Sequence, residues 1–355
     1  MDIKNLGFTG EMKAYGAAHE LESFETGRVI AEHRERYTVK TAEDVYDAEL
    51  LGNLRFTAES REDFPAVGDW VAITPYDEDK ALIHAIYPRY SIMARQAVDK
   101  KGEKQVIATN IDFGLIVQSV NRDFSINRLD RYLTICHSAK IRPIIILSKI
   151  DLIGEEELGT ILTQINSRIK DIPILTVSNQ EENGYDQVIE RVESGKTYCL
   201  LGSSGVGKST LLNYLSGQEQ MKTGAISESI DRGKHVTSHR ELVALDGGGI
   251  LIDNPGMREV GIADASGGLD MTFDEIVALS ADCKYKDCTH LHEEGCAILE
   301  ALANGELEQN AYDNYLKMYK EKMHFEANQE EKKKRDKNLG KMIKQFKKAR
   351  KQNKY

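Results

Sequence analysis

The sequence has no hydrophobic run long enough to cross a membrane, since no apolar stretch approaches the roughly 18 residues that a spanning helix needs. Residues 1–4 also lack the charged and then apolar order of a secretion signal. Cysteine is scarce, and five in 355 residues is an odd number, which argues against a disulfide framework. We therefore expect a soluble cytoplasmic protein that has no membrane partner.

Strong compositional bias is absent as well. Apolar residues make up 41% of the chain and charged residues 29%, which excludes wholesale disorder, a collagen-like repeat and a simple coiled coil. At about 150 residues per domain, this length is enough for two or three domains, each with its own core.

The charge is unevenly divided along the chain. Residues 332–355 contain 12 lysines and arginines against one acid, so this tail carries +11 although the whole chain carries −10. Such a block is either a solvated, self-repelling tail or a contact for a polyanion, and nucleic acid fits it better than a membrane. Its apolar residues have helical spacing, which predicts an amphipathic helix when the tail docks; they are Leu339, Met342, Ile343 and Phe346.

The pattern of short strands and turns in residues 28–95 is typical of a small β-barrel. Five β segments are predicted there, at 27–31, 36–39, 48–51, 70–73 and 82–86. Barrels of this kind often bind single-stranded nucleic acid, but 9 basic against 13 acidic residues do not favour a uniformly positive surface. From about residue 98 to about residue 262, apolar strands alternate with amphipathic helices, which predicts a parallel sheet covered by helices.

One segment matches the phosphate-binding pattern G-x-x-x-x-G-K-[ST] without a mismatch, between a predicted strand and a predicted helix. Backbone N–H groups of such a loop surround phosphate oxygens, its lysine reaches the β- and γ-phosphates, and its serine hydroxyl binds Mg²⁺. The predicted nucleotide-binding residues are Gly202, Ser203, Ser204, Gly205, Val206, Gly207, Lys208, Ser209 and Thr210. After the next predicted strand, Asp253 can hold Mg²⁺ through water and Gly256 can offer its N–H to the γ-phosphate.

A base-reading motif is predicted after the strand at 143–147. Ser148, Lys149 and Asp151 match the guanine-reading pattern Asn-Lys-x-Asp except at its first position. The Asp151 carboxylate can accept hydrogen bonds from guanine N1–H and from the 2-amino group, which adenine does not offer. Ser178 and Asn179, after a further strand, can place a backbone N–H near guanine O6. A plain loop at the end of a strand is the alternative interpretation of Ser-Lys-x-Asp.

The order of these motifs is unusual, because the base-reading segments precede the phosphate loop, whereas an ordinary GTPase has the loop first. A circular permutation explains the order, since a sheet keeps its neighbouring strands when the chain ends are moved. With this order of motifs, a barrel that starts at Gly27–Ile30 and a late cysteine cluster, the chain resembles the RsgA (YjeQ/YloQ) family of circularly permuted GTPases, which act in small-ribosomal-subunit assembly.

The resemblance implies that a first switch lies between the phosphate loop and Asp253. Residues 233–238 are similar to the family's Gly-Arg-His-Thr-Thr-Thr, which makes Thr237 a candidate γ-phosphate sensor and a Mg²⁺ ligand beside Ser209 and Asp253. Met257 stands where many GTPases have a glutamine that orients the attacking water. We therefore hypothesise slow intrinsic hydrolysis, with His235 or a group from the partner positioning water, and take His235, Lys208 and Thr237 as the candidate catalytic residues.

A metal site is predicted at Cys283, Cys288, His290 and Cys296, which offer three thiolates and an imidazole within 14 residues. Soft donors at this spacing suit tetrahedral Zn²⁺, and four protein ligands leave no open position, so the ion would be structural. His292 is a weaker competitor for the place of His290. The resemblance implies the same four ligands for one zinc ion, and we hypothesise that GTP state reaches this module along the roughly 30 residues that follow Gly256.

The sequence thus predicts a multidomain protein: an N-terminal arm and OB-fold β-barrel (1–97), a circularly permuted α/β P-loop GTPase (98–264), a mainly helical zinc-binding domain (265–330) and a basic tail (331–355). The resemblance implies a monomer that hydrolyses GTP to GDP and phosphate with Mg²⁺, is stimulated by the small ribosomal subunit, and binds its rRNA late in maturation. Two alternatives remain open. One is a nucleotide-gated RNA-binding scaffold in which hydrolysis is incidental, and the other is an ATP-driven P-loop protein, which Asp151 disfavours.

Overall fold

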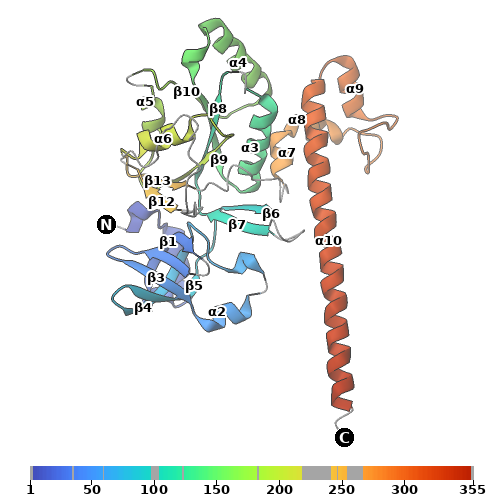
Figure 1. The fold of residues 1–355 in the computed structure, drawn as a ribbon. Coiled ribbons are helices and arrows are strands. Elements are labelled where there is room, and N and C mark those ends of the chain that lie inside the picture. Colours follow the sequence, from blue (N-terminus) through green and yellow to red (C-terminus); the bar gives the residue numbers. More distant parts are fainter. Residues whose placement is uncertain are drawn as a thin grey trace, which may run out of the picture.

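The computed structural model describes residues 3–33, 36–58, 60–96, 104–121, 124–181, 184–217, 241–245, 247–253 and 267–352. A barrel of strands lies below a sheet that is covered by helices, and a helical unit with one long helix stands beside both (Figure 1). In the described part of the chain, no helix has the length and apolar character that crossing a bilayer requires.

The first five strands close into a barrel. They are β1 (Glu25–His33), β2 (Arg36–Lys40), β3 (Val45–Leu50), β4 (Trp70–Asp77) and β5 (Lys80–Ile86). The order around the barrel is β1-β2-β3-β5-β4, and β4 pairs with β1 again. Only β3 and β5 run parallel, as in an OB fold. Each of the five strands overlaps a segment that the sequence predicts, because alternate residues such as Val29, Val39 and Ile73 point into the barrel core.

The elements around the barrel were harder to foresee. They are the helices η1 (Ile3–Leu6), α1 (Gly10–Ala18), η2 (Leu21–Ser23), α2 (Gly52–Thr57) and η3 (Arg61–Asp63), and a hairpin of β6 (Ile92–Gln96) and β7 (Lys104–Thr109). The sequence does not predict this hairpin, because each strand is short and, among the described strands, pairs only with the other.

Arg28 is fully buried where the arm, the barrel and the end of β7 meet. Its guanidinium donates hydrogen bonds to the carbonyl oxygens of Leu6 (2.6 Å), Asn110 (3.1 Å) and Gly68 (3.2 Å). Burial lowers the pKa of Arg28, although nearby acidic groups oppose the shift. Because a buried charge is costly unless all its donors are paired, these three bonds fix the three segments to one another.

The central sheet has the order β10-β9-β8-β11-β13-β12. Its strands are β8 (Phe113–Ser119), β9 (Arg142–Ser148), β10 (Ile174–Val177), β11 (Thr197–Leu201), β12 (Glu241–Ala244) and β13 (Ile250–Asp253). All pairs are parallel except the β12–β13 pair, and β12 also pairs with β1 of the barrel. The strands that come first in the chain thus lie on one side of β11 and those that come last lie on the other.

Helices cover both faces of this sheet. Those that follow β8 and β9 are α3 (Ile126–Ser138), η4 (Ile150–Leu152) and α4 (Glu155–Arg168); those next to β10 and β11 are α5 (Asp186–Ile189) and α6 (Lys208–Leu215). Residues of α3 and α4 share one apolar cluster with the sheet, and residues of α5 and α6 share another. Cys136 and Cys199 lie fully buried in the first cluster as packing residues, and burial raises the pKa of Cys199 to about 12.

The C-terminal helical unit consists of α7 (Gly268–Thr272), α8 (Asp274–Ser280), α9 (Ala297–Asn304) and α10 (Gln309–Gln352). Its small core is built around Leu269, Phe273, Ile276 and Ile298. α10 continues as one helix through the basic tail, so the helix that the sequence predicts on docking is present in the chain alone. The predicted domain boundaries at 97/98 and 264/265 fall outside the described residues and stay predictions, and the one at 330/331 falls within α10.

Candidate functional site

The phosphate loop lies at the carboxyl end of β11, in the middle of the sheet. β8, β9 and β10 extend from β11 in one direction, and β13 lies on its other side. In open parallel sheets, ligands bind at the carboxyl ends of the strands where the order reverses in this way. The matched sequence motif therefore sits at the position in the sheet that favours a nucleotide.

The shape of this loop favours glycine at three positions, since Gly202, Gly205 and Gly207 all have positive φ. Gly202 has φ +142°, and a Cβ atom on it would lie 2.3 Å from the carbonyl oxygen of Val117 on β8. Gly207 has φ +99° and immediately precedes α6, so the free N–H groups of the first helical turn, which includes Ser209 and Thr210, lie at the end of the loop. The Nζ of Lys208 donates to the carbonyl oxygens of Gly202 (2.7 Å) and Ser203, which folds the lysine back over the loop.

The segment after β9 contacts the phosphate loop directly. The hydroxyl of Ser148 donates to the carbonyl oxygen of Val206 at 2.6 Å, and Nζ of Lys149 donates to that of Gly205 at 2.7 Å. Ser148, the departure from the Asn-Lys-x-Asp pattern, is nearly buried. The serine side chain, although shorter than asparagine, thus reaches the phosphate loop and forms a hydrogen bond with it.

The two predicted base-reading segments also contact each other. The hydroxyl of Ser178 donates to Oδ1 of Asp151 at 2.6 Å, and it accepts a hydrogen bond from the backbone N–H of Gln180 at 3.1 Å. Ser178 is buried, whereas Asp151 and Asn179 are exposed. The buried hydroxyl therefore orients a carboxylate that faces solvent at the carboxyl ends of β9 and β10.

The remaining predicted residues are placed only in part. Asp253 ends β13, one position beyond the pair formed by Ile252 and Cys199 of β11, so its backbone lies beside the phosphate-loop strand. The candidate switch and water-positioning residues lie outside the described residues; they are His235, Thr237, Gly256 and Met257.

A further residue, Arg128, touches the loop without a signal in the sequence. Arg128, in the first turn of α3, donates from Nη1 to the hydroxyl of Ser203 at 3.1 Å. An arginine in a helix has no sequence signature that connects it with a loop 75 positions later, so only the fold could reveal this contact.

Comparison with known proteins agrees with this geometry. The model of the RsgA GTPase family matches residues 86–263. The small ribosomal subunit biogenesis GTPase RsgA 1 of Bacteroides thetaiotaomicron is 37% identical over 327 residues, which cover 91% of this chain and 90% of that protein. The chain belongs to the RsgA GTPase family. RsgA 2 of Lactiplantibacillus plantarum, a small ribosomal subunit biogenesis GTPase, is 41% identical over 295 residues, or 83% of this chain and 82% of its own.

Two solved structures have a similar fold. The crystal structure of YjeQ from Thermotoga maritima matches with a TM-score of 0.62 at 24% identity and covers 84% of this chain and 98% of that one. YloQ, described as a circularly permuted GTPase, matches with the same TM-score at 27% identity and covers 86% of this chain and 97% of its own. The circular permutation inferred from the order of the motifs is confirmed.

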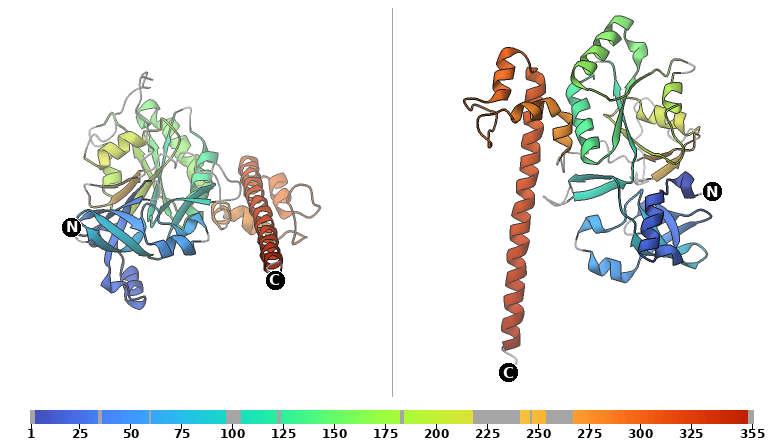
Figure 2. Two further views of the ribbon diagram at one scale, coloured as in Figure 1. Left: turned by 60° about the horizontal axis from the view of Figure 1, so that its bottom comes forward. Right: turned by 180° about the vertical axis from the view of Figure 1, so that it is seen from behind.

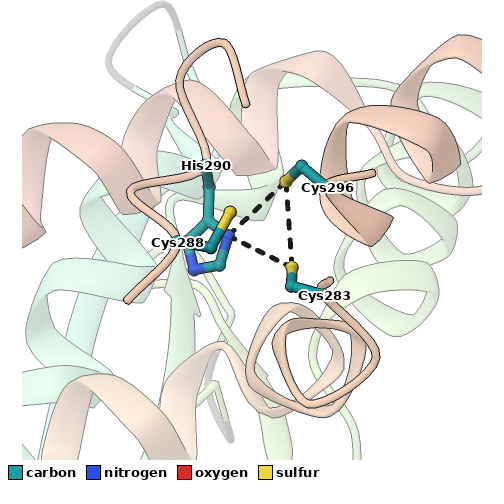
Figure 3. A group of neighbouring side chains, drawn as sticks. All are labelled: Cys283, Cys288, His290 and Cys296. Carbon is teal, nitrogen blue, oxygen red and sulfur yellow. Dashed lines mark hydrogen bonds between the residues drawn. The ribbon is translucent and has the colours of Figure 1, made fainter. Parts of the chain in front are cut away.

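The second site of this RsgA-family chain is the cluster of Cys283, Cys288, His290 and Cys296, whose potential ligand atoms all lie within 4.8 Å of one another (Figure 3). Nδ1 of His290 is 3.5 Å from the sulfur atoms of Cys283 and Cys296, and these sulfurs are 3.9 Å apart. Tetrahedral Zn²⁺ with Zn–S of about 2.3 Å and Zn–N of about 2.0 Å separates its ligand atoms by about 3.5–3.8 Å. The donor set and its spacing therefore fit a zinc ion.

Two further residues brace this cluster. The carboxylate of Glu293 accepts hydrogen bonds from the backbone N–H groups of Thr289 (2.9 Å) and Leu291 (3.0 Å), and its bond with the hydroxyl of Thr289 is the main reason that the pKa of Glu293 is held well below its usual range. Tyr312 of α10 donates its hydroxyl to the carbonyl oxygen of His290 at 2.5 Å. In the sequence, the position of Glu293 between His290 and Cys296 is a signal for a role beside the metal ligands. No such signal marks Tyr312.

We expect a His290→Ala protein to lose its zinc, whereas His292→Ala should keep one ion per chain. His292 is exposed and stands outside the cluster, so it is the matched control. Because metal binding free energy is also folding free energy in such small units, His290→Ala should also lower the unfolding temperature of the C-terminal helical unit. Metal content by mass spectrometry of the intact protein and thermal unfolding measure both effects. Equal zinc loss in the two variants would contradict this ligand set.

Proposed function

We propose that this member of the RsgA GTPase family acts on the small ribosomal subunit in the cytoplasm, where it binds rRNA late in assembly as a monomer and hydrolyses GTP to GDP and phosphate. One observation carries the nucleotide part of this proposal: Ser148 and Lys149 contact the phosphate loop, so base-reading and phosphate-binding segments that are distant in sequence form one site. The relatives named for small-ribosomal-subunit biogenesis support the partner.

The proposed roles follow from the chemistry of each group. Asp151, oriented by Ser178, accepts hydrogen bonds from guanine N1–H and the 2-amino group, and the backbone around Asn179 meets guanine O6. Lys208 leaves the carbonyl oxygens it now contacts and binds the β- and γ-phosphates.

Mg²⁺, held by Ser209, Thr237 and Asp253, supplies charge neutralisation at these phosphates when it is bound. Gly256 offers its N–H to the γ-phosphate, and His235 positions the attacking water. One structural Zn²⁺ holds the cysteine cluster. The basic end of α10 is the segment whose charge best suits rRNA.

The experiment that tests this function is phosphate release from GTP and from ATP, with and without purified small subunits. We expect slow release from GTP alone, an increase of at least about tenfold with subunits because an ordered switch loop can position water, and no release from ATP. Equal rates with GTP and ATP would contradict the guanine site. Tight GTP binding with no stimulation would favour the rival function, a nucleotide-gated RNA-binding scaffold, which the methionine at position 257 keeps open.

A further inference from the structure

Helix α3 lies between the central sheet and the C-terminal helical unit (Figures 1 and 2). One face of α3, with Leu129, Leu133 and Cys136, packs in the apolar cluster that it shares with the sheet. Asp130 contacts α10, and Thr134 and His137 contact α7. A single helix thus contacts both the fold that carries the nucleotide site and the unit that carries the metal cluster.

The contact between α3 and α7 is tight. The hydroxyl of Thr134 donates to that of Thr272 at 3.0 Å, and Nδ1 of His137 is 3.1 Å from the same oxygen. A Cβ atom on Gly268 would lie 2.0 Å from the hydroxyl oxygen of Ser138, so only glycine allows the two helices to approach this closely. The C-terminal helical unit is therefore held at α3 by packing, and not only by the chain that leads into it.

The contact between α3 and α10 is polar and largely buried. Oδ2 of Asp130 accepts a hydrogen bond from Asn314 of α10 at 2.8 Å and forms an ion pair with Arg168 of α4 at 2.5 Å. Burial raises the pKa of Asp130 to about 6, although Arg168 and Asn314 oppose the shift. Because a buried carboxylate that loses a donor is costly, Asn314 fixes α10 to this turn of α3.

The phosphate loop is attached to the same turn of α3. Arg128 lies two residues before Asp130 and donates to the hydroxyl of Ser203, while it also lines a groove of about 380 Å³ between α3 and α10. Asp313 of α10 lines that groove too, next to Asn314. Arg128 therefore contacts the phosphate loop and at the same time borders the groove against α10.

We propose that Arg128 is a positioning residue that couples the phosphate loop to the seating of α10 on α3, so that nucleotide binding and docking of the C-terminal helical unit stabilise each other. The route runs through Ser203, Arg128, Asp130 and Asn314, and then through Tyr312 to the carbonyl oxygen of His290 in the metal cluster. This route differs from the one hypothesised from the sequence, which runs along the chain after Gly256. The coupling rests on the proposed nucleotide site, and linkage makes it reciprocal.

A double-mutant cycle tests the coupling through the affinity for GDP and for a non-hydrolysable GTP analogue. Arg128→Ala and Asn314→Ala should each weaken binding about fivefold, and the double variant should bind no more weakly than Arg128→Ala alone, because both changes break one route. Glu321→Gln is the matched control, since it breaks the half-exposed pair with Arg131 in the same interface and should leave affinity unchanged. Effects that multiply would overturn the proposal.

Amide hydrogen exchange provides a second test, and its first comparison, between the unmodified protein with and without nucleotide, needs no variant. Nucleotide should slow exchange in residues 309–320 of α10, and Arg128→Ala should abolish that protection while zinc content stays at the wild-type level. Exchange in α10 that is the same with and without bound nucleotide would overturn the coupling. A wild-type protein that binds no guanine nucleotide would instead refute the proposed function, so the two failures are distinguishable.

Discussion

Replacing Asp151 with asparagine should lower GTP affinity by about a hundredfold or more and give measurable binding of xanthosine triphosphate. In the proposed site, the aspartate oxygens accept two charge-assisted hydrogen bonds from guanine, and each is worth about 1.5–3 kcal/mol. The asparagine side chain has one acceptor oxygen, and its NH₂ group would face the 2-amino group of guanine. Both groups are hydrogen-bond donors, so this hydrogen bond is lost. Xanthine carries an oxygen at that position, which matches the asparagine amide.

Competition titrations with a fluorescent guanine nucleotide measure both affinities. Glu155→Gln, an exposed change at the start of α4, is the matched control and should leave both unchanged. Because the hydroxyl of Ser178 donates to Oδ1 of Asp151, it can also donate to the asparagine oxygen, so the variant should keep the local geometry. An Asp151→Asn protein with wild-type GTP affinity would show that the base binds elsewhere.

Replacing Lys208 with alanine should lower the GTPase rate at saturating GTP by about a hundredfold or more. This lysine is the cation proposed to contact the oxygens on which charge develops as the phosphoryl group is transferred, and removing one preorganised donor of this kind costs about 10²–10³ in rate. Its Nζ also donates to the carbonyl oxygens of Gly202 and Ser203, so alanine removes these two hydrogen bonds as well.

Lys196→Ala is the control for this experiment. Lys196 immediately precedes β11, at the opposite end of the strand from the phosphate loop, and forms a half-exposed ion pair with Asp112 at 3.2 Å. Removing it changes the net charge by the same amount without touching the proposed site. Equal rates for the two variants would refute the role of Lys208, provided that thermal unfolding shows both to be folded.

The sequence predicted the parts of the fold whose signals are local. The barrel strands follow from alternation of apolar residues, and the sheet strands next to the nucleotide motifs follow from apolar runs that end in serine, glycine or aspartate. The permutation followed from the order of motifs alone, because each motif demands a fixed place at the edge of a parallel sheet. The metal site could also be predicted from the sequence, since three cysteines and a histidine within 14 residues are typical of a metal site.

Contacts between distant segments could not be predicted in this way. Asp130 and Asn314 are 184 positions apart, and each reads in the sequence as an ordinary polar residue on a helix. The same holds for Arg28, whose three carbonyl partners come from three segments. Such polar groups are satisfied only by the assembled fold, so their partners follow from packing and not from any pattern along the chain.

The continuity of α10 gives the basic end of the chain a fixed reach. At 1.5 Å per residue, the part of the helix beyond Asn314 is about 57 Å long, so a tilt of about 10° at its root would sweep the tip through about 10 Å. At this root Asn314 donates to Asp130, and Tyr312 donates to the carbonyl oxygen of His290. A small change in the tilt of α10 at its root would therefore displace its tip by a distance similar to the width of a nucleic-acid groove.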